Sequence, residues 1–177
     1  MILELTEAQK IDQKITQRDL NAYEEKVRIL TNNHFHVPGV RITELEIGLK
    51  GVIKLPAEFA GLFKDDTVEI SGTRYNDGLY TVAEISAESI TLNGERWVPE
   101  IAKKGVLILV KYPDDVLDGV SKLISYRVKM GSKSGLKSKT VARMSETYFD
   151  VNATDNVDGF PASMFSFLDK YKKLRWS

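Results

Sequence analysis

The chain of 177 residues has 25 basic residues, 25 acidic residues and no cysteine, so its formal net charge is zero. The absence of cysteine excludes disulfide bonds, thiolate zinc sites and cysteine nucleophiles. Overall neutrality argues against a general nucleic-acid coat, and neither a membrane-spanning segment nor a signal peptide is expected.

The first part of the chain is expected to be helical. Between residues 15 and 35, apolar side chains recur with the spacing of one helix face. Thr16 is a suitable N-cap and Asp19, three residues later, completes a variant of the capping box. Pro38–Gly39 is expected to end this segment, and a shorter helical turn is expected around residues 6–9. The recurring apolar residues are Leu20, Tyr23, Val27 and Leu30.

Between residues 40 and 112 the apolar period changes to two, which predicts β-strands. Strands are expected within residues 68–70, 79–85, 89–92 and 105–110. Asn76–Gly78 predicts a turn, and Asn93–Gly94 predicts a two-residue hairpin. The run Val106–Val110 is apolar on both faces, so we expect it at the centre of the sheet.

Helical spacing returns after Pro113 and continues with an apolar stripe to Val128. A polar loop over residues 131–138 and a strand within residues 140–151 are expected next. Pro161 is expected to open a last helix with one apolar face. The residues of that face are Met164, Phe165, Leu168, Tyr171 and Leu174.

These elements predict an α+β fold built on a helical body of three to four helices. The body would comprise residues 1–39 and 113–177. It would be interrupted by an inserted small antiparallel β module, residues 40–112, which forms a sheet or a half-open barrel.

The sequence contains no recognisable catalytic motif, so no enzyme activity, metal or cofactor is predicted. His34 and His36 could bind a metal, but spacing marks no third ligand, and they are interpreted as residues that solvate a helix end. A metal-dependent hydrolase that uses this pair is an alternative. Asp65–Asp66 and Asp114–Asp115 occupy ordinary turn and cap positions.

The charge is distributed unevenly. Between Gly119 and Ser145 there are seven basic residues and no acidic one, which fits either a solvated surface or contact with a phosphate backbone. A second basic cluster ends in Arg175–Trp176 and fits either a helix C-terminus or a docking surface. The seven residues, called the basic run below, are Lys122, Arg127, Lys129, Lys133, Lys137, Lys139 and Arg143.

Several short motifs in the last third of the chain resemble those of the tailed-bacteriophage head–tail connector proteins, also called adaptor or head-completion proteins. The N-terminal Thr6–Gln9 helix before a longer one is similar too. The stretch Ile70–Val82 looks like insertions of phage structural proteins. The motifs in the last third are Tyr112–Val116, Leu123–Tyr126, Lys137–Tyr148, Gly159–Pro161 and Leu168–Arg175.

The resemblance implies a non-enzymatic virion structural protein. Copies, commonly twelve, would form a ring below the portal protein, extend the DNA channel without sequence specificity and present a platform for a stopper or tail-completion protein. The protein would reside in the virion neck, and in the host cytoplasm before assembly. The alternative from the residues alone is a small nucleic-acid-binding module with a basic arm.

The resemblance also suggests site residues. Lys133, Lys137 and Lys139 would face the channel and its DNA, or a neighbouring subunit. The candidate portal-docking residues are Tyr171, Lys172, Lys173, Leu174, Arg175 and Trp176.

Overall fold

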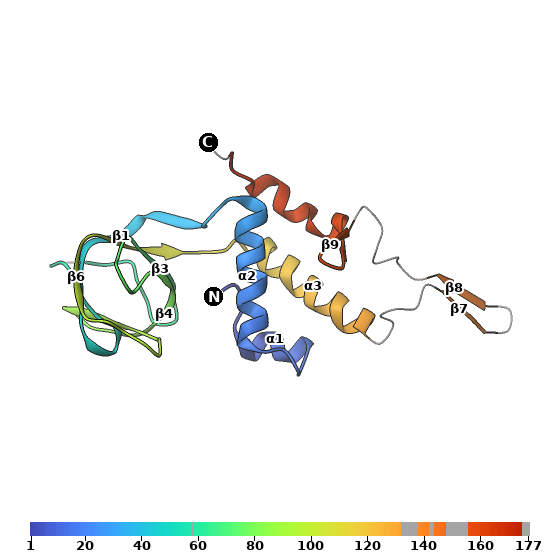
Figure 1. Ribbon diagram of the computed structural model, residues 1–177, viewed down its shortest axis with the longest axis horizontal. Helices are drawn as coiled ribbons and strands as arrows, with labels where there is room; N and C mark the ends of the chain where they lie inside the picture. Colours follow the sequence, from blue (N-terminus) through green and yellow to red (C-terminus); the bar gives the residue numbers. More distant parts are fainter. Residues whose placement is uncertain (58, 132–137, 142–143, 148–155, 175–177) are drawn as a thin grey trace. The chain divides into compact units, whose positions relative to one another are not determined.

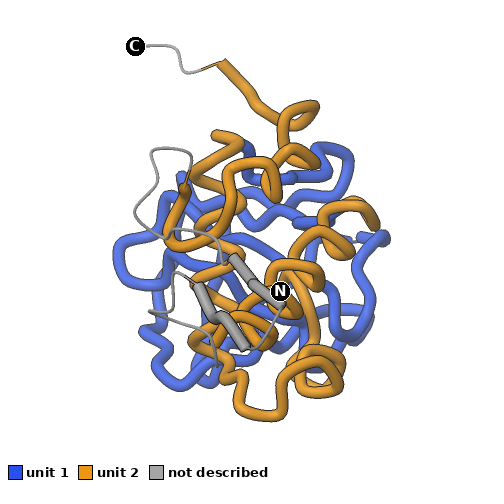
Figure 2. The backbone as a smooth tube through the Cα atoms, turned by 90° about the vertical axis from the view of Figure 1, so that its right-hand side faces the viewer, with its two compact units in different colours: residues 1, 33–112 blue, residues 2–32, 113–177 orange. Residues whose placement is uncertain are grey.

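The computed structural model describes residues 1–57, 59–131, 138–141, 144–147 and 156–174, of which residues 138–141 and 144–147 are described by their backbone only. The chain divides into two compact units. Figure 2 colours the first unit, residues 1 and 33–112, separately from the second, residues 2–32 and 113–177. Within the described ranges, no helix combines the length and apolar character needed to cross a membrane.

The first unit is a closed barrel of six antiparallel strands (Figure 1). Around the barrel the strand order is β1-β2-β5-β4-β3-β6, and β6 pairs again with β1. A short helical turn, η1 (Leu49–Gly51), connects β1 to β2. The strands are β1 (His36–Ile47), β2 (Val52–Lys54), β3 (Thr67–Ser71), β4 (Gly78–Ile85), β5 (Ser89–Leu92) and β6 (Glu100–Val110).

The closed barrel corrects the expected architecture. The chain is broadly α+β, but its β part is neither a small sheet nor a half-open barrel within a helical body. Strand β1 begins at His36 and runs through Pro38–Gly39, which the sequence pattern assigned to the end of a helical segment. Its register with β6 shifts between His36 and Arg41 and again between Thr43 and Leu45. Such irregularities bend a strand, which lets β1 curve round to close the barrel.

The strands alternate between the barrel core and its exterior. In β3, Val68 and Ile70 are buried while Glu69 between them faces outward. The hairpin predicted at Asn93–Gly94 is wrong, because β5 pairs with β2 and β4 rather than with β6. The residues after β5 instead bring Trp97 against the core. The fully buried core residues include Leu45, Ile53, Val68, Val82, Ile90 and Leu107.

The second unit consists mainly of helices. The helices α1 and η2 both contact α3, and η2 also contacts α2. Two small antiparallel ladders, β7–β8 and β9–β10, belong to this unit. Its elements are α1 (Leu5–Ile11), α2 (Gln17–Thr31), α3 (Asp114–Gly131), β7 (Ser138–Val141), β8 (Met144–Thr147), β9 (Asn156–Val157), β10 (Phe160–Pro161) and η2 (Ala162–Tyr171).

An aromatic cluster lies in the core of the second unit. The Phe160 ring lies 6.3 Å from Tyr23, 5.9 Å from Tyr126 and 6.0 Å from Phe165, measured between ring centroids. These contacts join β10, α2, α3 and η2. The turn between β9 and β10 places Phe160 at this point.

The capping box predicted at the start of α2 is confirmed. The Asp19 backbone N–H donates to Thr16 Oγ1 (3.3 Å), and the Thr16 N–H donates to Asp19 Oδ2 (2.9 Å). Arg127 of α3 forms ion pairs with Asp19 (3.1 Å) and Asp12 (3.3 Å). The hydrogen bonds from Thr16, assisted by Arg127, lower the pKa of Asp19 from 3.8 to about 2.

This capping box predicts an acid-sensitive contribution to stability. Because the pKa of Asp19 is lower in the folded chain, the ionised carboxylate stabilises the fold above pH 3.8, and the contribution is lost as pH falls through about 2. We expect Asp19→Asn to lower the free energy of unfolding at pH 7 by about 1 kcal/mol. Between pH 4 and pH 2 the variant should lose less stability than the wild type.

Urea denaturation at several pH values measures this effect. Asp118→Asn is a suitable control, because Asp118 pairs with Lys122 on the exposed surface of α3 (2.6 Å), and its loss should change the free energy of unfolding by only a few tenths of a kcal/mol. An acid dependence that is the same in Asp19→Asn and in the wild type would contradict the assignment.

Candidate functional site

Residues 172–174, which follow η2, are held by hydrogen bonds to the end of α2. The Lys173 backbone N–H donates to the carbonyl of Thr31 (2.7 Å), one of the last carbonyls of α2. Asn32, the C-cap of α2, donates from Nδ2 to the carbonyl of Leu174 (3.2 Å). The last carbonyls of a helix lack partners within the helix and need hydrogen-bond donors from elsewhere. Here the Lys173 N–H is the donor to the carbonyl of Thr31. We call residues 172–174 the terminal segment.

The last turn of η2 is fixed to the start of α3. The Tyr171 hydroxyl donates to Asp115 Oδ1 (2.6 Å), and Lys170 Nζ lies 2.8 Å from Asp115 Oδ2. Hydrogen bonding from Lys170 and Tyr171 lowers the pKa of Asp115, while its carboxylate raises the pKa values of Lys170 and Tyr171. The polar groups of this turn therefore serve to position the terminal segment.

The structure places the candidate docking residues in different environments. Tyr171 is half-buried and its hydroxyl is bound to Asp115. Lys172 and Lys173 are exposed, and Lys172 Nζ pairs with Asp169 (2.8 Å). Leu174, which the helical pattern assigned to an apolar face, lies beyond the end of η2 and is 78% exposed. Arg175 and Trp176 lie outside the described residues.

The basic run is partly neutralised by acids that lie outside it, one in the same helix and two near the start of the chain. Lys122 pairs with Asp118 (2.6 Å), and Arg127 pairs with Asp12 and Asp19. Lys129 is exposed. These ion pairs occupy two of the cations that the sequence pattern made available to a phosphate backbone. Lys133, Lys137 and Arg143 lie outside the described residues, and Lys139 lies in β7, where only the backbone is described.

Two histidines and a glutamate meet on the outside of the barrel. Glu69 Oε2 lies 2.6 Å from His36 Nε2 and 3.1 Å from His34 Nδ1. The three potential ligand atoms, one from each residue, lie within 4.8 Å of one another. The sequence pattern identified the two histidines but missed Glu69, because Glu69 lies on β3 and no local spacing connects it to His34.

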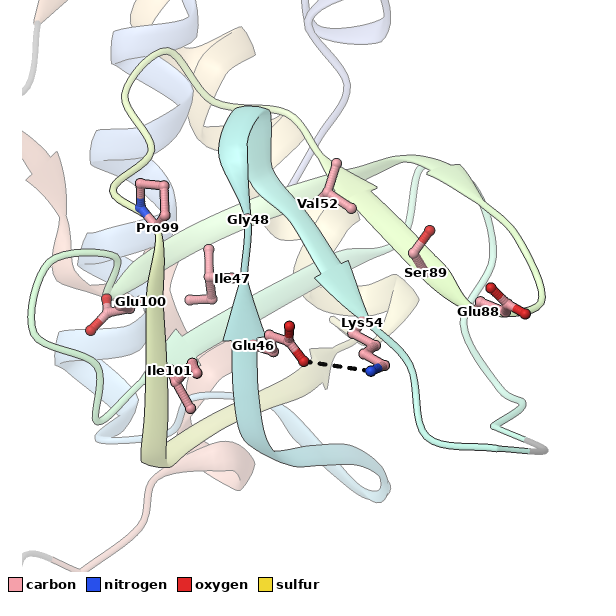
Figure 3. A pocket seen from close by; sticks show the side chains of 10 residues that line it. All are labelled: Glu46, Ile47, Gly48, Val52, Lys54, Glu88, Ser89, Pro99, Glu100 and Ile101. Carbon is pink, nitrogen blue, oxygen red and sulfur yellow. Dashed lines mark ion pairs between the residues drawn. The ribbon is translucent and has the colours of Figure 1, made fainter.

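An open groove of about 570 Å³ lies on the barrel and is lined by the end of β1, by β2 and by the starts of β5 and β6. Figure 3 shows Ile47, Val52 and Ile101 among its lining side chains, with the Glu46–Lys54 ion pair (3.7 Å) at one side. Ile101 is 76% exposed. The groove was not anticipated from the sequence, because its walls come from strands that are far apart along the chain.

Two of the three acids that line the groove, Glu46 and Glu100, have structural partners. The Glu100 carboxylate accepts hydrogen bonds from the backbone N–H groups of Arg74 (3.1 Å) and Tyr75 (3.3 Å) and from Asn76 Nδ2 (2.5 Å). Glu46 is paired with Lys54. These contacts of Glu46 and Glu100 therefore hold loops and strands in place. The groove offers an apolar surface with polar edges.

The terminal segment, the histidine–glutamate cluster and the groove are thus three separate features of the described residues. The first presents an exposed leucine on a fixed backbone, the second presents nitrogen and oxygen ligands, and the third is an apolar depression. In comparisons with known proteins, no protein-family model and no curated protein sequence matches this chain.

Proposed function

We propose that this chain is a non-enzymatic structural component of a tailed-phage neck, a head–tail connector that binds the portal protein. In this proposal copies of the chain form a ring, with twelve copies expected, below the portal. The ring extends the DNA channel and provides the platform for a stopper or tail-completion protein. The support is the motif resemblance in the last third of the chain together with the geometry of the terminal segment.

The observation that carries the proposal is the conformation of residues 172–174. The backbone of this segment is held by Thr31 and Asn32 at the end of α2, while the Leu174 side chain is 78% exposed. A segment whose backbone is already fixed loses little conformational entropy when its side chains bind a partner. Such an arrangement favours a docking function.

The terminal segment also indicates the chemistry of its partner. An exposed leucine that directly follows Lys172 and Lys173 fits an apolar pocket with an acidic rim. The leucine would supply most of the affinity by leaving water, and the lysines would favour correctly oriented encounters. The portal surface that receives this segment is therefore expected to combine these two properties.

Replacement of Leu174 by aspartate tests the docking role. We expect Leu174→Asp to weaken binding to the cognate portal protein that this proposal requires by roughly a hundredfold, since it removes the apolar contact and places an acid against an acidic rim. Biolayer interferometry measures the affinity, and negative-stain electron microscopy shows whether rings form on the portal. Leu174→Asp should retain the fold, because the hydrogen bonds of this segment are made by its backbone.

Leu49→Asp is the matched control, because Leu49 is also an exposed leucine (71%) but lies in η1 of the barrel unit. It should leave portal affinity unchanged. Equal affinities of Leu174→Asp and the wild type would rule out docking through the terminal segment. A wild-type chain that neither binds the portal nor forms rings at assembly concentrations would refute the proposed function itself.

A further inference from the structure

The sequence His34-Phe35-His36 leads into β1 with both imidazoles on the barrel exterior. Asn33 Oδ1 accepts a hydrogen bond from the Phe35 backbone N–H (2.9 Å), and Phe35 adopts a positive φ of 54°. The Phe35 side chain is buried and packs against the Tyr112 ring in a tilted arrangement, with the ring centroids 4.8 Å apart. The anchored phenylalanine leaves the imidazoles of His34 and His36 beside each other, with ring centroids 5.3 Å apart.

Glu69 reaches the same place from another strand. In β3 it faces outward between two core residues, so its backbone position is fixed by the barrel. Strand β6 lies between β3 and β1, and its Val110 pairs with Thr67 on one side and with His36 on the other. The cluster therefore spans three neighbouring strands, and the barrel fold rather than a local turn brings its members together.

We propose that His34, His36 and Glu69 bind one divalent transition-metal ion, with Zn²⁺ as the preferred ion. Two imidazoles and a carboxylate are ligands that zinc commonly takes in proteins, whereas Mg²⁺ and Ca²⁺ prefer oxygen ligands alone. This site goes beyond the proposed connector function and does not depend on it.

Two of the three ligand-atom separations are close to those of a tetrahedral site, and all three atoms lie within 4.8 Å of one another. Zinc bonds of about 2.0–2.1 Å place neighbouring tetrahedral ligand atoms about 3.3 Å apart. The two histidine–glutamate distances, 3.1 Å and 2.6 Å, are somewhat shorter than this value. Side-chain rotations that move the ligand atoms by less than about an ångström would therefore make room for the ion between the imidazoles and the carboxylate. The exposed fractions of the His34, His36 and Glu69 side chains are 58%, 33% and 15%, so a water can reach the remaining position.

Metal binding would join the start of β1 to β3 across β6. An ion that binds only the folded barrel raises its stability in proportion to the logarithm of the free metal concentration. The dependence of stability on metal concentration gives a second measurement besides binding affinity. The midpoint of thermal unfolding should rise with Zn²⁺ concentration in the wild type.

The test uses the full chain after treatment with a chelator. Isothermal titration with Zn²⁺ should give one ion per chain, and titration with Co²⁺ should give the visible absorption of a tetrahedral site. His34→Ala, His36→Ala and Glu69→Gln should each weaken Zn²⁺ binding by roughly tenfold or more, since each removes a ligand. Glu84→Gln, which alters an exposed glutamate on β4, is the control and should bind as the wild type does.

His34→Ala is the most informative variant, because His34 precedes β1 and its side chain is largely exposed, so the barrel should fold without it. Loss of affinity in His34→Ala and Glu69→Gln, with unchanged circular dichroism, supports the site. The proposal is overturned if the wild type shows no saturable Zn²⁺ binding. It is equally overturned if the two variants bind as tightly as Glu84→Gln.

Discussion

Replacing Asn76 by alanine is expected to lower the free energy of unfolding by about 3 kcal/mol. Asn76 is 1% exposed, and its side chain connects the loop after β3 to the start of β6. Its Nδ2 donates to the Val98 carbonyl (2.8 Å) and to Glu100 Oε1 (2.5 Å), and its Oδ1 accepts the Val98 N–H (3.0 Å). The alanine variant loses all three hydrogen bonds and leaves a small cavity.

Urea denaturation of the wild type and the variant measures this loss. Asn93→Ala is the matched control, because Asn93 makes an exposed side-chain hydrogen bond to Thr81 Oγ1 (3.0 Å), and its loss should cost about 1 kcal/mol or less. If the two variants were equally stable, Asn76 would not be the central connection of this loop.

Asn76→Asp provides a sharper test of the same contact. The aspartate would replace the Nδ2 donor by an oxygen beside Glu100, so two carboxylates would face each other at neutral pH. We expect this variant to be at least as unstable as Asn76→Ala at pH 7. Part of its stability should return near pH 4, because protonation of either carboxyl restores a donor.

The features that could be predicted from sequence are those that depend on neighbouring residues. The Thr16–Asp19 capping box was predicted correctly because both hydrogen bonds join residues three apart. Helix α3, which begins at Asp114, was predicted from the spacing of its apolar residues and the acids in its first turn. The strands β3 to β6 were located by their period-two pattern.

The closure of the barrel could not be predicted in the same way. It depends on β1, in which Pro38 falls within a shift of register against β6, where a missing backbone N–H is tolerated. In the sequence, the same Pro38–Gly39 pair instead indicates the end of a helical segment. Glu44, with a positive φ of 59°, lies at the second shift, and glutamate carries no sequence signal for that conformation.

The candidate sites were predicted only in part, for a related reason. The helical pattern was extended to Leu174, but η2 ends at Tyr171 and the Lys173 N–H pairs with Thr31 of α2. Arg127 was counted as an available cation, although its partners Asp12 and Asp19 come from the beginning of the chain. Contacts between distant segments determine both where η2 ends and how Arg127 is paired. The spacing of neighbouring residues does not indicate such contacts.

Replacing Gly51 by alanine should destabilise the barrel about as strongly as the loss of Asn76. Gly51 lies at the end of η1 with a φ of +75°, a conformation that costs an alanine about 1 kcal/mol or more. An added Cβ would also lie 2.7 Å from the backbone oxygen of Leu92 and 2.5 Å from the Trp97 indole. Since a backbone oxygen of the barrel cannot move aside readily, we expect a total loss of about 3 kcal/mol in the free energy of unfolding.

Gly48→Ala is the matched control for this prediction, because it changes a glycine at the other end of the same turn. Its added Cβ would lie 3.4 Å from the Val52 carbonyl oxygen, an ordinary contact, and its φ of −94° suits alanine. Denaturation curves should therefore place Gly48→Ala within about 1 kcal/mol of the wild type. In a Trp97→Leu background, Gly51→Ala should cost less than in the wild type but still more than Gly48→Ala, since the smaller side chain relieves the indole clash but neither the backbone contact nor the positive φ. If Gly51→Ala cost nothing in the Trp97→Leu background, the indole alone would require glycine at position 51.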